Sequence, residues 1–373
     1  MIKIDRRLIK NIDFPTFLIT VILSVIGIMT IYSATRPILD SNQPDFYIKQ
    51  IIWLILSITI LVFFVSFDYI WLGRLSTFIY ITGVILLALV FLMGKTGMGA
   101  QRWLKIGPIS FQPSEFFKII YIIMLSHFLS LIKGPIDRNS LLKIFFYITI
   151  VPLILLIKQP DLGTSLIVII IFFSLIILKG ISRRLLFLMI IIGIISLPFL
   201  GHIFWEGLKD YQKERIIAFI DPDVDPSGIG YQLNQSKITI GSGKLLGKGY
   251  LKGTQGPFRF LPEKHTDFIF AVFAEEWGFI GSTVLIILYA LLILRGLDTA
   301  NKAKDDFGRF LSLGICLMFI TYTTINIGMT LGLMPVVGIP LPFMSYGGTA
   351  LVSNFIAIGI LINIRTRRFE LFH

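Results

Sequence analysis

Long apolar runs, each of about twenty residues, recur along this 373-residue chain. A helix needs about 20 apolar residues to cross the hydrocarbon core of a bilayer, because each residue rises about 1.5 Å. The first run is too long for the core of a signal peptide, so we expect it to be retained. Ten runs qualify as transmembrane helices, near residues 14–35, 47–67, 70–94, 115–132, 139–157, 163–181, 184–204, 267–295, 308–332 and 348–364.

Composition supports an all-α polytopic membrane protein. Charged residues make up 15% of the chain and mean hydropathy is +0.83, whereas soluble domains carry about 25% charged residues. The apolar runs do not alternate with polar residues, which excludes an outer-membrane barrel. The net charge of +12 lies mostly between these runs. It therefore reflects membrane topology, and we expect no nucleic acid as a partner.

Charge distribution predicts the orientation, because positively charged short loops tend to stay in the cytoplasm. With ten helices both termini share one side, and that side carries eighteen Lys and Arg against six on the other. We therefore expect cytoplasmic termini and interpret residues 1–373 as one integral membrane domain. Residues 205–266 form a long extracytoplasmic loop, left out of that count. Six basic residues against one acid in its stretch 237–265 predict an anionic partner outside the cytoplasm.

Glycines and lysines are concentrated in the loop segment GSGKLLGKGYLKGTQ, residues 241–255. The segment fails the spacing of a Walker phosphate-binding motif. Two interpretations stay open. Its backbone amides and Lys248 approach a diphosphate, or the glycines form turns and the lysines are solvated.

Asp267 follows FLPEKHT and opens an apolar helix at the outer surface. It either caps the helix or acts as a general base toward a sugar hydroxyl. Glu275 and Glu276 lie about two turns further along. Because they are adjacent, at most one of them should line the cavity of Asp267. We interpret His265 as a hydrogen-bonding loop residue, not a zinc ligand.

Two further outer segments carry charges beside helix starts. In RWLKIGPISFQPSEFFK, which we interpret as a loop dipping toward the membrane, Glu115 and Lys118 are spaced to pair with each other. Alternatively Lys118 faces Asp267, which leaves Glu115 and Arg102 for the substrate. In KQPDLGTS, Asp161 either belongs to a capped helix start or contacts the substrate. The uncharged segment MPVVGIPLPFMSYGG, 334–348, must be buried or line a cavity at membrane depth, where it forms a wall or admits a lipid tail.

Five of these motifs occur in a fixed order: QPSEFFK, KQPDLGTS, GYQLNQSKITIGSG, FLPEKHTDFIFAVFAEEWGFIG and GIPLPFMSYGG. With them, residues 14–367 resemble the SEDS family of bacterial peptidoglycan polymerases, its elongation (RodA-like) type more than its division (FtsW-like) type. The resemblance implies an inverting membrane glycosyltransferase that uses lipid II as donor and acceptor and expels undecaprenyl diphosphate. It implies Asp267 as general base, with Lys118 and Glu115 as further catalytic residues. We expect substrate contacts from Arg102, Trp103, Lys158, Asp161, Gln235, Ser236, Lys248, Gln255, Glu263, His265, Thr266 and Ser345.

The resemblance also implies partners and a location. We expect a class B penicillin-binding protein and other elongation-complex proteins beside this chain. The bilayer is that of the bacterial inner membrane, with the active site on its extracytoplasmic side. No cofactor is predicted with certainty. Mg²⁺ or Mn²⁺ at the diphosphate stays an open alternative, and no compact carboxylate cluster in the sequence identifies a site for it. Other functions left open are a lipid II flippase and a scaffold without catalysis.

Overall fold

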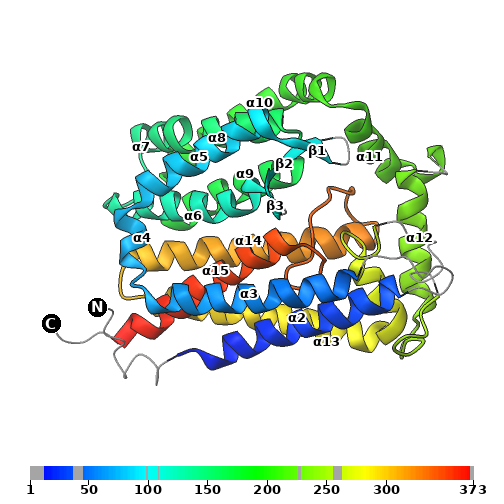
Figure 1. The fold of residues 1–373 in the computed structure, drawn as a ribbon. Coiled ribbons are helices and arrows are strands. Elements are labelled where there is room, and N and C mark those ends of the chain that lie inside the picture. Colours follow the sequence, from blue (N-terminus) through cyan, green and yellow to red (C-terminus); the bar gives the residue numbers. More distant parts are fainter. Residues whose placement is uncertain are drawn as a thin grey trace.

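A computed structural model describes residues 12–36, 45–97, 100–107, 109–225, 228–254 and 263–369. Most of them lie in long helices packed side by side (Figure 1). The helices are α2 (Phe14–Thr35), α3 (Phe46–Ser66), α4 (Ile70–Arg74), α5 (Ser76–Met93), α6 (Pro113–Leu131), α7 (Arg138–Lys143), η1 (Ile144–Thr149), α8 (Ile150–Lys158), α9 (Leu162–Lys179), α10 (Arg183–Gly207), α11 (Asp210–Ile220), η2 (Pro222–Val224), α12 (Ile229–Ser242), α13 (Ile269–Asn301), α14 (Asp306–Thr330), α15 (Gly348–Thr366) and η3 (Arg367–Phe369).

Helices occupy all ten predicted transmembrane segments. Within the described residues, nine stretches are long and apolar enough to cross a membrane. The tenth predicted segment is α10, a 25-residue helix with Pro198 inside it. The segment 139–157 is less regular than predicted, because the π-helix η1 separates α7 from α8. The expected polytopic all-α architecture is confirmed.

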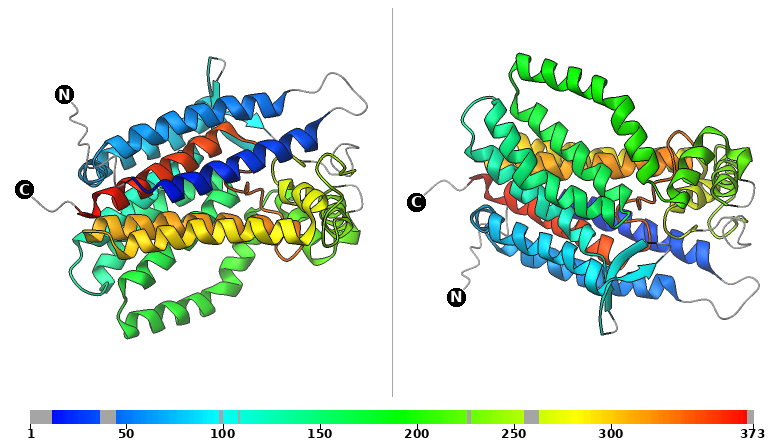
Figure 2. Two further views of the ribbon diagram at one scale, coloured as in Figure 1. Left: turned by 90° about the horizontal axis from the view of Figure 1, so that it is seen from below. Right: turned by 90° about the horizontal axis from the view of Figure 1, so that it is seen from above.

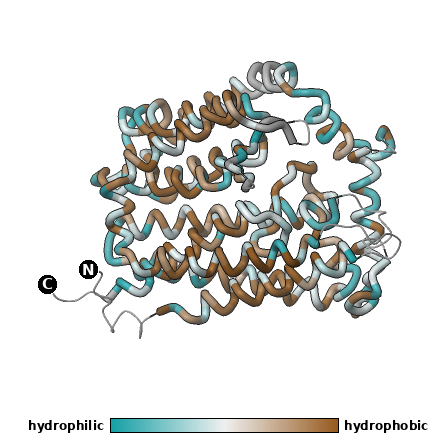
Figure 3. Tube along the Cα trace, in the orientation of Figure 1, coloured by the Kyte–Doolittle hydropathy of each residue, from teal (hydrophilic) through white to brown (hydrophobic). Residues whose placement is uncertain are grey.

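The centre of the bundle is formed by α14 and α15. They are the most buried of the nine spans: 72% of the residues in the apolar window of α14 and 78% of those in α15 are buried. Helix α14 packs against α13, and α15 packs against α3. The start of α2 and the end of α15 lie at the same end of the bundle (Figures 1 and 2). Hydrophobic residues fill its middle, and hydrophilic residues collect toward its two ends (Figure 3). This distribution is that of a chain spanning a bilayer.

Between α5 and α6 the chain forms a small antiparallel sheet in place of the predicted dipping loop. Its strands β1 (Lys95–Gly97), β2 (Ala100–Ile106) and β3 (Ile109–Phe111) pair in that order. Leu104 on β2 pairs with Phe111 on β3. The sheet fixes Arg102 and Trp103 just before α6 begins.

The predicted long loop contains two further helices, α11 and α12, and leads into α13. That helix begins at Ile269 and is broken at Gly278, whose φ is 64°. A side chain there would meet the backbone nitrogen of Gly247 at 2.3 Å, so glycine is required for the close approach of the loop. Gln255, one of the predicted substrate residues, lies outside the described residues.

Candidate active site

A cavity of about 320 Å³ lies where α6, α9 and α13 begin. Residues from distant parts of the sequence meet in it. Eight of the predicted site residues line it: Arg102, Trp103, Glu115, Lys118, Asp161, Glu263, Thr266 and Asp267.

Asp267 lies in the turn before α13, and its backbone is firmly held. Three successive carbonyl oxygens accept hydrogen bonds: His265 from the Tyr346 N–H at 2.8 Å, Thr266 from the Ser345 hydroxyl at 2.7 Å, and Asp267 from the Asn326 amide at 3.0 Å. No described residue donates a hydrogen bond to the Asp267 carboxylate. The capping interpretation is therefore wrong, because Phe268 occupies the cap position. A carboxylate that receives no hydrogen bond from the described residues is free to accept a proton.

Arg215 of α11 is the positive charge that acts most strongly on the Asp267 carboxylate. A Cβ atom added to Gly338 would lie 3.2 Å from Arg215 Nη1 and 3.4 Å from Asp267 Oδ2, so this glycine lies between the two side chains. Burial raises the pKa of Asp267 to about 6, although the positive charge of Arg215 opposes the rise. Burial also lowers the pKa of Arg215 below its usual value.

Asp161 holds Arg102 at the edge of the cavity. Its carboxylate accepts hydrogen bonds from the Ser114 hydroxyl at 2.8 Å and from the Thr164 amide at 3.2 Å, and it lies 4.0 Å from Arg102 Nη1. Arg102 also donates to the Pro160 carbonyl. Burial opposes ionisation of Asp161, but Arg102 and the hydrogen bonds outweigh it and its pKa lies below the usual range. Asp161 therefore both caps α9 and positions Arg102.

Glu115 and Lys118 pair with each other, which was one of the two interpretations above. Lys118 Nζ lies 2.7 Å from Glu115 Oε1 and also donates to the Tyr322 hydroxyl. Both side chains are buried in the cavity wall. The alternative, in which Lys118 holds the charge of Asp267, is wrong because Arg215 faces Asp267 instead.

Comparison with known proteins identifies the family of this chain. The FtsW/RodA/SpoVE family, described as cell cycle proteins, matches residues 14–370. This chain belongs to that family. It is 43% identical over 295 residues to the peptidoglycan glycosyltransferase MrdB of Escherichia coli K12, covering 79% of this chain and 78% of MrdB. It is 31% identical over 433 residues to the peptidoglycan glycosyltransferase RodA of Treponema pallidum, covering 97% and 99%.

Solved structures of similar proteins share the fold. RodA of Thermus thermophilus, a rod shape determining protein, is 26% identical with a TM-score of 0.70 over 96% of this chain and 98% of that chain. A chain from a structure titled "Structural coordination of polymerization and crosslinking by a peptidoglycan synthase complex" is 28% identical. Its TM-score is 0.81 over 96% of this chain and 99% of that chain. The resemblance to the SEDS family is confirmed.

Several predicted site residues of this FtsW/RodA/SpoVE family member do not line the cavity. Lys248 forms an ion pair with Glu275 at 2.6 Å, so its charge is already paired within the protein and its predicted diphosphate contact is not supported. Ser236 donates to the Thr330 carbonyl, and Ser345 supports the Asp267 turn from behind. Lys158 is exposed, and Gln235 lies on α12 outside the cavity lining.

His265 and the two adjacent acids of α13, Glu275 and Glu276, contribute to the packing around the site. His265 contacts the rings of Phe46 and Tyr346, and burial lowers its pKa. Glu275 and Glu276 are both buried, and neither lines the cavity of Asp267. The expectation that at most one of them would line this cavity holds. Within the described part of the chain, no three His, Cys, Asp or Glu side chains gather as metal ligands.

Arg215, Tyr211 and Tyr322 also line the cavity but were not predicted. Arg215 lies in the charged stretch DYQKER, which resembles an exposed loop face. Asn326, a polar residue in an apolar run, gave a usable signal: a buried amide requires partners, and here it holds the Asp267 turn.

Proposed function

We propose that this chain is a peptidoglycan glycosyltransferase that polymerises lipid II, with Asp267 as its general base. The observation that carries the proposal is the Asp267 carboxylate, which receives no hydrogen bond from the described residues and shares a cavity with Arg102 and Arg215. The relatives MrdB and RodA, which are named peptidoglycan glycosyltransferases, support it.

The reaction joins two sugars that are linked to polyprenyl diphosphate. A hydroxyl of the acceptor sugar attacks the anomeric carbon of the donor, and Asp267 takes the hydroxyl proton. As the new carbon–oxygen bond forms, the bond from the anomeric carbon to the diphosphate breaks. Its electron pair leaves with the diphosphate. Attack opposite the leaving group inverts the anomeric configuration.

The cations of the cavity stabilise the departing charge. Arg102 and Arg215 both line the cavity, and Arg102 is already held by the Pro160 carbonyl and Asp161, so little reorganisation of Arg102 is needed during the reaction. Asp161 fixes Arg102. Glu115 and Lys118 satisfy each other and Tyr322. We assign this pair to positioning the sugars and Asp267 to proton transfer.

We further propose that the cavity opens on the extracytoplasmic side of the inner membrane. The excess of Lys and Arg on the side of the termini supports this orientation. A class B penicillin-binding protein and other elongation-complex proteins are the proposed partners. The similarity to a chain from a complex that coordinates polymerization and crosslinking supports a crosslinking partner.

Glycan formation by the purified chain tests the proposed function. Lipid II supplied in detergent needs no flipping, so polymer formation separates a polymerase from a flippase or a scaffold. We expect Asp267→Asn to lower the rate by about 10²- to 10⁴-fold. Its unfolding temperature should equal or exceed that of the parent, because the fold disfavours the charged form of this side chain.

Asp223→Asn is the matched control, since Asp223 is an exposed carboxylate on the same outer segment. We expect this variant to polymerise as the parent does. Full glycan synthesis by well-folded Asp267→Asn protein would reject Asp267 as the base.

A further inference from the structure

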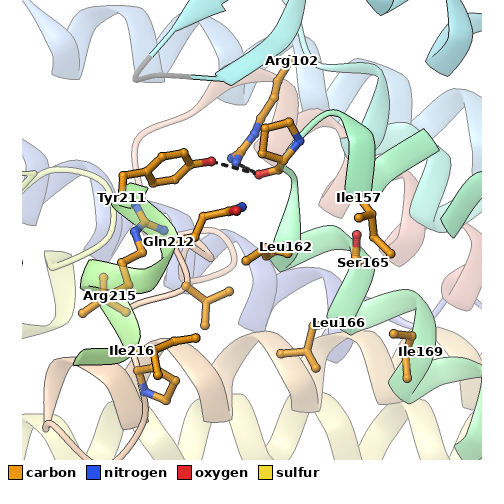
Figure 4. Close-up of a pocket in the computed structure, with 14 residues that line it drawn as sticks. Arg102, Ile157, Leu162, Ser165, Leu166, Ile169, Tyr211, Gln212, Arg215 and Ile216 are labelled. Carbon is orange, nitrogen blue, oxygen red and sulfur yellow. Dashed lines mark hydrogen bonds between the residues drawn. The ribbon is translucent and has the colours of Figure 1, made fainter. Parts of the chain in front are cut away.

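A second cavity, of about 230 Å³, adjoins the cavity of Asp267. The two share Arg102, Tyr211 and Arg215. These polar side chains lie toward one end of the second cavity, while Leu166 and Ile169 lie at the other (Figure 4). Beyond them its lining is mostly apolar, and we call it the α9 groove.

The α9 groove runs along α9 from the start of that apolar helix toward its middle. Leu162, Leu166 and Ile169 occupy the first two turns of α9, which rise about 10 Å along its axis. Leu166 is 36% exposed and Ile157, also in the lining, is 46% exposed. The groove is therefore open on its side, where lipid chains surround the protein.

Among the described residues, the carboxylates that act on the cationic end of the groove are Asp161, beside Arg102, and Asp267, which faces Arg215. The Nε atoms of Arg102 and Arg215 are buried without a hydrogen-bond partner among the described residues. No described carboxylate lies within 4.0 Å of Arg215, and its guanidinium carbon lies 5.8 Å from the ring centroid of Tyr211. A buried guanidinium is costly unless it is paired. An anion at this end satisfies both arginines.

We propose that the α9 groove holds the polyprenyl tail of the donor substrate, with the donor diphosphate on Arg102 and Arg215. The assignment rests on the proposed function and deepens it, because it separates donor from acceptor. A molecule that is polar, anionic and then apolar along its length matches the order of the Asp267 cavity, the two arginines and the groove.

The chemistry of transfer selects the donor over the acceptor. The donor diphosphate is attached to the carbon that is attacked, so only that one carbon separates it from the attacking hydroxyl and its base. In the acceptor, the disaccharide separates the attacking hydroxyl from the diphosphate. The side chains of Arg215 and Asp267 both approach Gly338. The arginines are thus close enough to Asp267 to bind the leaving group and too close to bind the acceptor diphosphate.

Binding of undecaprenyl diphosphate to purified Asp267→Asn protein tests the groove without turnover. We introduce Leu166→Trp into this background, so that the indole ring fills the groove. The polyprenyl tail is surrounded by apolar lipid or detergent before it binds, so burial in the groove adds little hydrophobic free energy. The groove therefore binds the tail through complementary shape and packing. We expect Leu166→Trp to weaken binding of undecaprenyl diphosphate roughly tenfold and to leave binding of inorganic pyrophosphate unchanged. Arg215→Gln should weaken both probes.

Ile177→Trp is the matched control, because Ile177 is an exposed residue near the other end of α9. It should bind both probes as the Asp267→Asn parent does. Unchanged binding of undecaprenyl diphosphate by Leu166→Trp, or an equal loss in Ile177→Trp, would overturn the groove assignment. Glycan synthesis is measured separately on chains with Asp267 intact. An inactive chain whose tail binding still depends on Leu166 would reject the proposed function alone.

Discussion

The proton affinity of one carboxylate sets the chemistry of the candidate site. Burial raises the pKa of Asp267 to about 6, and the positive charge of Arg215 limits that rise. A base with this pKa is mostly ionised at neutral pH, yet it holds a proton more strongly than an exposed aspartate does. Gly338 makes the arrangement feasible, since a larger residue there would crowd Arg215.

The pH dependence of the reaction tests this balance. For the parent, kcat/KM should rise with pH through about 6, because the carboxylate must be deprotonated to act as base. Arg215→Gln should move this acid limb to higher pH, since it removes the charge that favours ionisation. Arg215→Lys keeps a positive charge and should leave the limb near its original place. An acid limb that does not move in Arg215→Gln would contradict the electrostatic coupling.

At the scale of elements, the segment between α14 and α15 fixes the Asp267 turn. Tyr346 and Ser345 bond to the first two carbonyls of the turn, and Asn326 of α14 bonds to the third. The same Asn326 amide donates to the Ile339 carbonyl at 2.8 Å. One side chain thereby ties a helix, the turn and the segment together.

Removing that amide should misplace the base. In Asn326→Ala, two buried carbonyls lose a donor, which costs roughly 1–3 kcal/mol of folding free energy. We expect kcat to fall at least tenfold with little change in the KM for lipid II, because Asn326 acts through Asp267. Thr321→Ala on the same helix is the control, since Thr321 bonds to its own helix at Leu317. Equal losses of kcat in the two variants would argue against a positioning role.

At the scale of the whole molecule, two buried acids attach the outer loop to the bundle. Glu275 accepts from Lys248 at 2.6 Å and from the Thr254 backbone at 3.0 Å. Glu276 accepts from Ser33 of α2 and from the Leu251 backbone. The GKGYLKGT stretch is therefore a fastening between α13 and α2.

A thermal unfolding experiment distinguishes this fastening from a substrate clamp. Lys248→Met leaves Glu275 buried with a weakened set of partners and should destabilise the protein by roughly 1–3 kcal/mol. The double variant Lys248→Met/Glu275→Gln should recover much of the loss, because a neutral amide is cheaper to bury than a carboxylate that has lost its ion pair with Lys248. The KM for lipid II should stay unchanged in the double variant. A raised KM at parental stability would restore Lys248 to the substrate site.

Hydropathy sufficed to predict the spans, because the bilayer imposes length and apolarity on each helix separately. The site was only partly predictable. Asp267, Arg102 and Asp161 sit at helix starts or in short motifs where local sequence carries the signal. The role of Arg215 depends on the fold of the long loop, which brings α11 over Asp267. The diphosphate contact predicted for Lys248 is not supported, because a glycine-lysine pattern suits both a phosphate and a buried carboxylate, and the structure pairs Lys248 with Glu275, 27 residues away.

The sharing of Arg102 and Arg215 by two cavities has a practical consequence for inhibitor design. A compound that competes with both the sugar and the tail of the donor needs three parts. These are an anionic centre for the guanidinium pair, a polar arm toward Asp267 and a short apolar arm along α9. Truncating either arm should reveal which cavity contributes more affinity. Compounds with the anionic centre replaced by a neutral isostere would lose the anchor common to both.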